Sequence, residues 1–308
     1  MQFYLAPMEG VTTWVYRKAH AEVYGALDKY FIPFLEAPEK REFKTRELQE
    51  ILPEHNKGIR AVPQILTNRA EAFIRVARAL QRLGYEEINL NLGCPSKTVA
   101  SRHRGSGFLA LPEELDHFLE EIFGVLDVKL SVKTRVGKES PEEFGRLLDI
   151  FNKYPMEELI VHPRIQKDYY KHEPRMECYE EARKRSRNPL CYNGDLFTGS
   201  LIRQFCEKYP DEERLMVGRG VILNPGLVHG GTKEKIMEFH ERLVKGYLDR
   251  GLSRTSLLFK MKELWFYQIH LFEDVKKYEK RIRKVQDLAE YLQIVEELFR
   301  ERDLCPPA

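Results

Sequence analysis

Eight short segments rich in β-branched and aromatic residues recur along the chain, and the stretches between them are long enough for a helix and two loops. Strands that alternate with helices in this way form parallel sheets, so the pattern predicts a TIM (β/α)8 barrel. An open doubly wound sheet is the alternative, and the first segment lacks the glycine-rich fingerprint of its dinucleotide-binding form. The segments cover residues 3–8, 29–35, 61–66, 87–93, 128–135, 158–164, 189–194 and 214–220.

The stretches between these segments carry helix start and stop signals. After the third segment, Asn68 and Glu71 have the spacing of a capping box, and Gly84 stands where a helix usually ends. Pro112, and Ser140 with the proline that follows it, mark the starts of two further helices. The α/β alternation therefore extends through the first three-quarters of the chain.

The pattern changes near residue 233, after which no further strand segment occurs. Residues 233–251, 256–273 and 283–300 have the apolar periodicity of helices. The 308 residues suit a barrel of about 250 residues with an appendage. We therefore predict a catalytic barrel domain over 1–232 and a small all-helical C-terminal domain over 233–308.

Composition narrows the class of protein. The net charge is only +2, so affinity for a polyanion must come from local clusters of basic residues. The five cysteines form no C-x-x-C pair and are odd in number, which argues against a metal site or a disulfide framework. No signal peptide or apolar run of membrane-spanning length is visible. We expect a cytoplasmic protein without a membrane partner.

The stretch NLNLGCPSK, residues 89–97, places Cys94 where a strand breaks into a turn. An unperturbed thiol has a pKa of about 8.5 and is mostly protonated at neutral pH, which suits a proton donor. The alternative is a small buried apolar side chain. Because Gly93 and Pro95 make a tight turn at the barrel rim, we favour a thiol that faces the mouth of the barrel.

Other candidates follow the later segments. Lys133 is either an outward charge or an inward cation beside an anionic ligand, and His162 is either a core histidine or a site residue. The loops at Gly194 and at Gly218-Arg219-Gly220 follow the seventh and eighth segments, where barrels often bind phosphate through backbone N–H groups. We favour a phosphate site there over glycines that only make turns.

Taken together, the motifs in barrel order resemble those of the tRNA-dihydrouridine synthases. The N-x-G-C-P-x-K and G-S-G motifs are the most specific of them, and K-E-L-W is similar to the bacterial C-type branch. The motifs are A-P-M-E-G-V (6–11), N-L-G-C-P-S-K (91–97), G-S-G (105–107), K-T-R-V-G (133–137), H-P-R (162–164), N-G-D (193–195), G-R-G (218–220) and K-E-L-W (262–265).

The resemblance implies a barrel that binds FMN and reduces uridine in tRNA to 5,6-dihydrouridine, with NADPH as the electron source. Flavin N5 would give hydride to uracil C6, and Cys94 would be the general acid that protonates C5. The motifs carry the flavin contacts over to Pro7, Met8, Glu9, Gln64, Lys133, His162, Asn193, Gly194, Asp195, Gly218 and Arg219.

The target base must leave the tRNA fold before it can stack on a flavin. The run KKYEKRIRK, residues 276–284, is basic. Such a run is often only a solvated helix face. Because the barrel does not need this segment, we expect it to be a surface that binds RNA phosphates. The expected partner is tRNA and not DNA, and the chain is expected to act as a monomer. The expected substrate contacts are Asn91, Lys97, Arg102, Arg104, Arg164, Lys280, Arg281, Arg283 and Lys284.

Two other functions fit parts of this pattern. A flavin-dependent reductase of a free pyrimidine or small enone would share Lys133 and the phosphate loops, and would not need the basic segment. A barrel that binds RNA without catalysis would need neither the thiol nor the flavin.

Overall fold

The structure is a computed structural model that describes residues 1–38 and 42–306. It divides into two compact units, which are described one at a time. The first contains residues 1–10, 27–195 and 210–217, and the second contains residues 11–26, 196–209 and 218 to the C-terminus.

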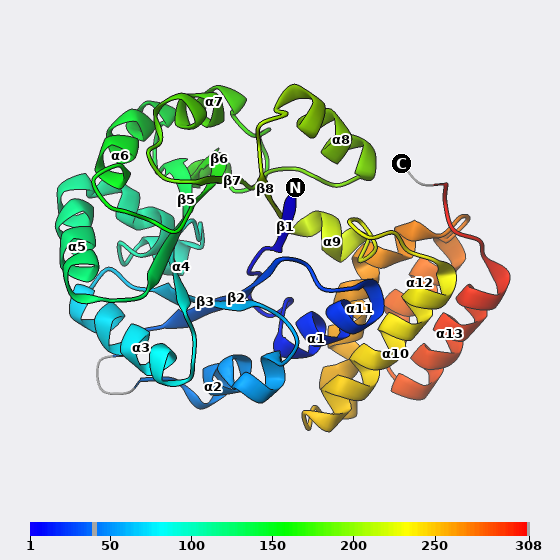
Figure 1. Cartoon of the computed structure of the whole chain (residues 1–308). Helices are drawn as coiled ribbons and strands as arrows, with labels where there is room; N and C mark the ends of the chain where they lie inside the picture. Colours follow the sequence, from blue (N-terminus) through cyan, green and yellow to red (C-terminus); the bar gives the residue numbers. More distant parts are fainter. Residues whose placement is uncertain (39–41, 307–308) are drawn as a thin grey trace. The chain divides into compact units, whose positions relative to one another are not determined.

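The first unit holds a closed barrel of eight parallel strands, each paired with its sequence neighbours, and β8 pairs with β1 (Figure 1). The predicted (β/α)8 barrel is confirmed, and the open sheet is excluded. The strands are β1 (Gln2–Leu5), β2 (Lys29–Glu36), β3 (Ala61–Leu66), β4 (Glu87–Leu92), β5 (Lys129–Gly137), β6 (Leu159–Ile165), β7 (Leu190–Tyr192) and β8 (Arg214–Val217).

Several helix signals read from the sequence are confirmed. Pro112 is the first residue of α5, Ser140 caps the turn that leads into α6, and Gly84 follows α3 with a φ of 91°. The helices of this unit are α2 (Thr45–Ile51), α3 (Ala70–Arg82), α4 (Lys97–Ala100), α5 (Pro112–Val125), α6 (Phe144–Phe151) and α7 (Met176–Arg185), with 3-10 turns η1 (Pro53–Asn56), η2 (Gly105–Ala110), η3 (Pro141–Glu143) and η4 (Gln166–Asp168).

The predicted capping box at Asn68 is wrong. The N-cap of α3 is Arg69, which makes no side-chain cap. The Asn68 side chain instead donates from Nδ2 to the carbonyl of Arg102, 3.3 Å away. A contact distant in sequence thus replaces the local one that the spacing suggested.

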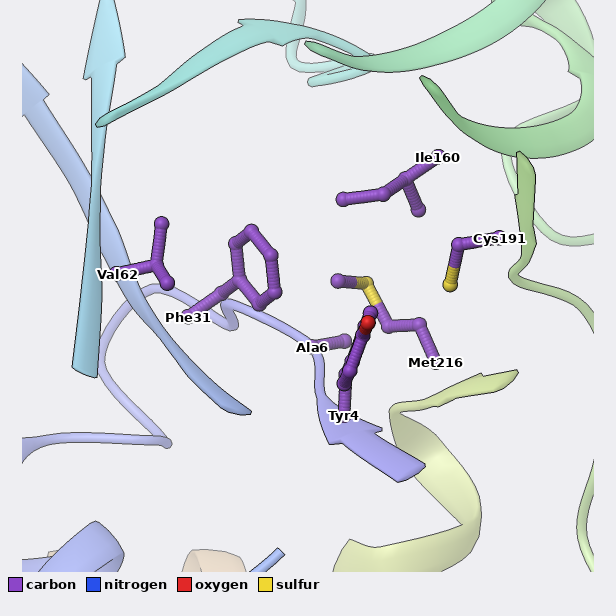
Figure 2. Packing of buried hydrophobic residues seen from close by; sticks show 7 residues of the cluster. All are labelled: Tyr4, Ala6, Phe31, Val62, Ile160, Cys191 and Met216. Atoms are coloured by element: carbon purple, nitrogen blue, oxygen red, sulfur yellow. The ribbon is translucent and has the colours of Figure 1, made fainter. Parts of the chain in front are cut away.

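The barrel interior is filled by side chains that alternate along the strands and point toward one another (Figure 2). Burial of this apolar surface is the main contribution to the stability of the barrel. Cys191 is part of this packing and is fully buried, so it is a core residue. The cluster comprises Tyr4, Ala6, Phe31, Val62, Ile160, Cys191 and Met216.

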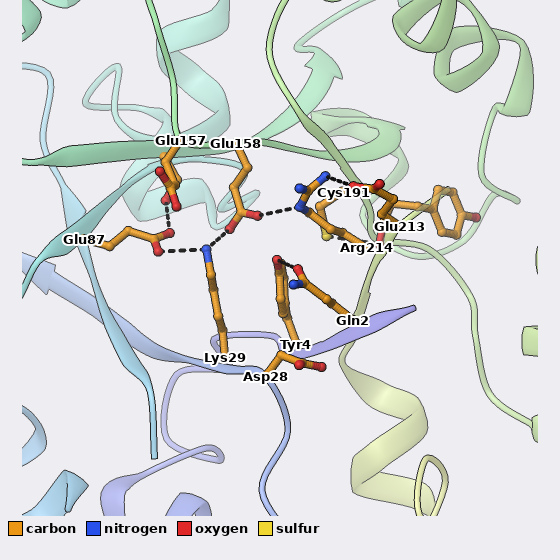
Figure 3. A network of polar contacts seen from close by, with 12 residues as sticks. Gln2, Tyr4, Asp28, Lys29, Glu87, Glu157, Glu158, Cys191, Glu213 and Arg214 are labelled. Atoms are coloured by element: carbon orange, nitrogen blue, oxygen red, sulfur yellow. Dashed lines mark hydrogen bonds and ion pairs between the residues drawn. The ribbon is translucent and has the colours of Figure 1, made fainter. Parts of the chain in front are cut away.

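A buried ion network lies where the even-numbered strands begin (Figure 3). Lys29 Nζ lies 2.7 Å from Glu87 and 2.9 Å from Glu158, and Arg214 lies 3.9 Å from Glu158. Burial raises the pKa of Glu158, and the charge of Lys29 opposes that shift. Removal of one partner would leave an uncompensated charge in the interior.

The second unit is helical. Its elements are α1 (Trp14–Tyr24), α8 (Gly199–Lys208), α9 (Arg219–Leu223), α10 (Lys233–Asp249), α11 (Arg254–Gln268), η5 (Ile269–Leu271), α12 (Lys276–Lys284) and α13 (Leu288–Glu301). Its core includes Trp265, which packs against His240 and Phe299 at ring distances of 5.8 and 5.9 Å. Within the described residues, no helix combines the length and the apolar character needed to cross a membrane.

The sequence predicted three helices after residue 233, and the described residues contain four. The basic run forms a helix of its own, α12. The next helix begins at Leu288 because Asp287 caps it, accepting hydrogen bonds from the N–H groups of Ala289 and Glu290 at 2.8 and 3.0 Å. A domain boundary after residue 232 stays a prediction, and residues 307–308 of that domain lie outside the described residues.

Candidate active site

The turn that carries Cys94 is held by a side chain from the strand before it. Asn91, in β4, accepts hydrogen bonds at Oδ1 from the N–H groups of Gly93 and Cys94, at 3.1 and 2.9 Å. The strand end therefore sets the position of the turn directly, because the accepting oxygen belongs to a buried residue of the barrel wall.

The G-S-G motif holds the same turn from the other side. Ser106 donates to the carbonyl of Cys94 from its N–H at 3.1 Å and from its hydroxyl at 2.7 Å. Gly105 has a φ of 56°, and a Cβ built there would lie 2.9 Å from the Cys94 carbonyl oxygen. Glycine is needed at 105 because both the backbone conformation and the space exclude a side chain.

The Cys94 side chain is half-buried. Burial raises the pKa of its thiol, while a hydrogen bond from the backbone of Ser96 opposes that shift. A raised pKa keeps the sulfur protonated at neutral pH. The thiol is therefore suited to giving up a proton to a carbanion-like centre and poorly suited to attack as a thiolate.

Lys133 stands on β5 in register with Asn91 on β4. Its side chain is half-buried, and burial together with the nearby charge of Arg135 lowers the pKa of the ammonium to about 8. The ammonium makes no hydrogen bond or ion pair with another residue of 1–38 or 42–306. An amine in this setting fits an anionic or electron-rich ligand.

Gln64 on β3 is fully buried. Its Oε1 accepts a hydrogen bond from Asn91 Nδ2 at 2.6 Å, and its Nε2 donates to Asn89 Oδ1 at 2.7 Å. These two bonds leave one amide N–H and one oxygen lone pair of Gln64 for another partner.

His162 and Asp195 are both predicted flavin contacts, and in the structure both form hydrogen bonds with Arg164. The Arg164 guanidinium donates to Nε2 of His162 and Oδ1 of Asp195, each at 2.9 Å, and to the carbonyl of His172 at 2.6 Å. Because a guanidinium only donates, His162 accepts at Nε2. The Arg164 side chain is fully buried and engaged by these groups. Its predicted contact with the substrate stays a prediction.

Sequence reasoning did not assign a role to Arg135, which ties two rim loops together. Its guanidinium donates to the carbonyls of Gly93 at 3.0 Å, Ile165 at 2.8 Å and Tyr169 at 2.9 Å. The loop after β4 is thereby joined to the loop after β6. The spacing K-x-R was a usable signal, because side chains two apart on a strand point to the same face.

The loops after β1 and β7 lie at the same end of their strands. Pro7 and Met8 are half-buried, and Glu9 is exposed. Asn193 donates from Nδ2 to the carbonyl of Met216 at 2.8 Å. A Cβ on Gly194 would overlap the hydroxyl of Tyr192, so this position also requires glycine.

The remaining two phosphate candidates belong to the second unit. Gly218 is the N-cap of α9, and Arg219 opens that helix. The Arg219 guanidinium lies 4.9 Å from the ring centre of Phe197, over its face. A phosphate role for these two residues stays a prediction.

Three basic residues follow Cys94 in the loop after β4. Lys97 and Arg102 are exposed, and Arg104 is half-buried. The Nε of Arg104 is buried and finds no acceptor within the described part of the chain. A buried donor without an acceptor is costly, which marks this group as one that a ligand could satisfy.

The basic helix α12 does not present all of its charges equally. Lys280, Arg283 and Lys284 are exposed. Arg281 instead forms an ion pair with Glu297 on α13. Three of the four expected contacts are therefore accessible, and the fourth fastens α12 to its neighbour.

The chain is similar to known proteins along most of its length. A model of the dihydrouridine synthase (Dus) family matches residues 4–305. The tRNA-dihydrouridine(16) synthase of Pseudomonas putida is 28% identical over 257 residues, 79% of each chain. The tRNA-dihydrouridine synthase B of Shewanella oneidensis is 25% identical over 315 residues, 97% of this chain and 96% of the relative.

A solved structure supports the fold. A 2-naphthoyl-CoA reductase in complex with 2-naphthoyl-CoA superposes with a TM-score of 0.57 at 10% identity, over 77% of this chain and 50% of the reductase. At this identity the likeness concerns the barrel fold alone.

The chain belongs to the dihydrouridine synthase family. The enzymes of this family are flavin-dependent oxidoreductases that act on tRNA uridines. The predicted family is thereby confirmed, and its C-type branch stays a prediction.

Proposed function

We propose that this protein is a tRNA-dihydrouridine synthase that binds FMN, takes electrons from NADPH and uses Cys94 as its general acid. The observation that carries the proposal is the Cys94 turn, which Asn91 and Ser106 hold in place by hydrogen bonds. Asn91 lies on β4, in register with Lys133 on the neighbouring strand β5. A half-buried acid and a cation that pairs with none of the described residues are thus brought to one barrel.

The residues present fit a flavin. The Lys133 ammonium supplies positive charge where it makes no protein ion pair within the described residues. Gln64 retains one N–H donor, and His162 is held with a fixed orientation by Arg164. A cation and oriented amide groups are what a flavin's polar ring edge requires. We therefore assign Lys133, Gln64 and His162 to hold it.

When bound, FMN supplies hydride to C6 of the target uracil. That addition leaves enolate-like charge at C5 and the C4 carbonyl, and the S–H bond of Cys94 breaks as its proton passes to C5. The uracil C5–C6 double bond becomes a single bond, and the thiolate is reprotonated by solvent. A positioned acid of this kind typically accelerates a reaction by about 10² to 10⁴-fold.

The tRNA would be held by charge presented on both units. In the first unit, Lys97, Arg102 and Arg104 follow the catalytic turn, and the buried Nε of Arg104 would gain an acceptor. In the second unit, Lys280 and its exposed neighbours on α12 provide phosphate contacts. This proposal assigns tRNA as partner and the helical residues after 233 as part of its binding surface.

Reaction of purified protein with unmodified tRNA, FMN and NADPH tests the function. We expect dihydrouridine in the digested tRNA, detected by mass spectrometry as a gain of two hydrogens, and its loss in Cys94→Ala. Cys206→Ala, at a half-buried cysteine on α8, is the matched control and should retain activity. Absence of dihydrouridine with the native protein, or full activity of Cys94→Ala, would contradict the proposal.

A triple variant separates this function from reduction of a free pyrimidine. Lys280→Ala, Arg283→Ala and Lys284→Ala together should weaken tRNA binding and leave NADPH-driven flavin reduction unchanged. Removing three phosphate contacts should also reduce the slope of log affinity against log salt by about two to three units. The control removes three exposed cations elsewhere, at Lys57, Lys184 and Arg187. Equal tRNA affinity in both triple variants would argue against this surface.

A further inference from the structure

A chain of buried hydrogen bonds begins in the ion network where the strands start. Ser131 on β5 donates from Oγ to Glu87 Oε1 at 3.0 Å. Asn89 on β4 donates from Nδ2 to that same Ser131 oxygen at 2.9 Å. Gln64 on β3 donates from Nε2 to Asn89 Oδ1 at 2.7 Å. All four side chains are buried.

The chain continues to the catalytic turn. Asn91 donates from Nδ2 to Gln64 Oε1 at 2.6 Å, and its own Oδ1 accepts from the N–H groups of Gly93 and Cys94. A connected series of hydrogen bonds therefore joins the first residue of β4, Glu87, to the backbone of Cys94.

The two ends give this series a single direction. At the rim, the N–H of Cys94 can only donate. At the other end, the Glu87 carboxylate accepts, and its second oxygen lies 2.7 Å from Lys29 Nζ. Between these ends each carboxamide has one orientation in which every bond pairs a donor with an acceptor. A reversed amide would place two donors or two acceptors face to face.

We propose that Glu87, Asn89 and Ser131 are positioning residues, which orient the carboxamides of Gln64 and Asn91 and thereby fix the turn that carries Cys94. None of the three reaches the turn itself, so they act only through the amides between. Their role in uridine reduction depends on the proposed function, while their effect on the thiol does not.

Ser131→Ala breaks the series near its fixed acceptor. The Asn89 amide loses the acceptor for its Nδ2, and the Glu87 carboxylate loses a donor. The Asn89 amide then keeps its orientation only through the bond that it accepts from Gln64. Its rotation becomes easier, and each rotation withdraws the acceptor from Gln64. The loss passes along the series, because each buried amide is oriented by the hydrogen bonds to its two neighbours.

The rate at which iodoacetamide alkylates Cys94 reports the position and mobility of the turn. It is measured on the full-length protein without tRNA or NADPH, by mass spectrometry of the Cys94 peptide. Ser131→Ala should raise this rate by about 3- to 10-fold, the change expected for one weakened hydrogen bond. Cys206 and Cys305 in the same sample are internal references whose rates should not change.

Ser186→Ala is the matched control, because it removes a serine hydroxyl whose hydrogen bonds to described residues all lie within the turn before β7. It should leave the Cys94 rate unchanged. If Ser131→Ala does not fold, Glu87→Gln serves in its place, because an amide at this end can donate and so removes the fixed direction. An unchanged or lower Cys94 rate in the folded variant would overturn the proposal.

A double-mutant cycle distinguishes relayed positioning from general loosening of the barrel. Asn91→Ala removes the last link of the series, so Ser131→Ala should add nothing to the Cys94 rate in that background. Rate effects that multiply independently would overturn the proposal. Because the readout needs no tRNA, a protein that fails to make dihydrouridine can still confirm or overturn the positioning role.

Discussion

Replacement of Gly105 by alanine tests how tightly the catalytic turn is built. Gly105 has a φ of 56°, a conformation that costs an L-residue about 1–2 kcal/mol. The new Cβ would lie 2.9 Å from the Cys94 carbonyl oxygen, 3.0 Å from Cys94 Cβ and 3.1 Å from Val99 Cγ1. Such overpacking costs about 1–3 kcal/mol more, because the first neighbour is backbone and cannot rotate away.

Two further glycines separate these contributions. Gly84 has a φ of 91° and open space around its position, so Gly84→Ala reports the conformational cost alone, about 1–2 kcal/mol. Gly124 lies in α5, and beyond its chain neighbours and the backbone of its own helix no described atom lies within 4 Å of an added Cβ. Gly124→Ala should therefore stabilise the chain by about 0.5–1 kcal/mol. The difference between Gly105→Ala and Gly84→Ala is the cost of contact with the Cys94 turn.

Urea unfolding followed by circular dichroism measures these free energies, since stability falls linearly with denaturant. We expect Gly105→Ala to be destabilised by about 2–5 kcal/mol in total. A cost for Gly105→Ala no larger than that for Gly84→Ala would refute the close packing of G-S-G on Cys94.

Two other predictions concern lysines of the barrel, one buried and one half-buried. Lys29→Met leaves Glu87 and Glu158 without their shared partner and should destabilise the protein by about 3–5 kcal/mol in urea unfolding. Lys129→Met, which removes a more exposed ammonium 3.5 Å from a carboxylate, should cost less than about 1 kcal/mol. The lowered pKa of Lys133, about 8, means that its positive charge is present below pH 8 and lost above it. The affinity for FMN, measured by fluorescence titration, should therefore fall above that pH. Lys133→Met should flatten this pH dependence. A pH dependence that survives in Lys133→Met would contradict the assignment of Lys133 to the flavin site.

The barrel was predictable because its signals are local. Strand segments and helix stripes occupy consecutive residues, and their alternation leaves few topologies. The Cys94 turn was predictable for the same reason, since the strand end, the glycine and the proline are adjacent in the sequence. The basic helix α12 was only partly predicted: its charge was evident, but its separation from α13 depends on the cap at Asp287.

The hydrogen-bond series through the barrel could not be read from the sequence. It depends on the register that places Gln64 beside Asn89, and Asn89 beside Ser131, on three neighbouring strands. A one-residue change of register would turn these side chains to the other face. The sequence held one usable signal, because Glu87, Asn89 and Asn91 are polar at alternate positions of an otherwise apolar strand.

The hydrogen bonds of Arg164 could not be read from the sequence for a related reason. Its partners His162 and Asp195 lie on β6 and after β7, and the sequence suggested a contact with substrate for the arginine. The structure shows a guanidinium engaged by both. Which of two polar groups faces a ligand and which supports it depends on burial, and burial follows from strand register and twist.

Single-turnover reoxidation of the reduced protein tests the central assignment most directly. Flavin bound to the protein is reduced in the absence of oxygen, unmodified tRNA is added, and the return of oxidised-flavin absorbance is followed. If Cys94 is the general acid, Cys94→Ala should bind the flavin normally and reoxidise about 10² to 10⁴-fold more slowly than the native protein. Reoxidation of Cys94→Ala by tRNA at the native rate would contradict the account.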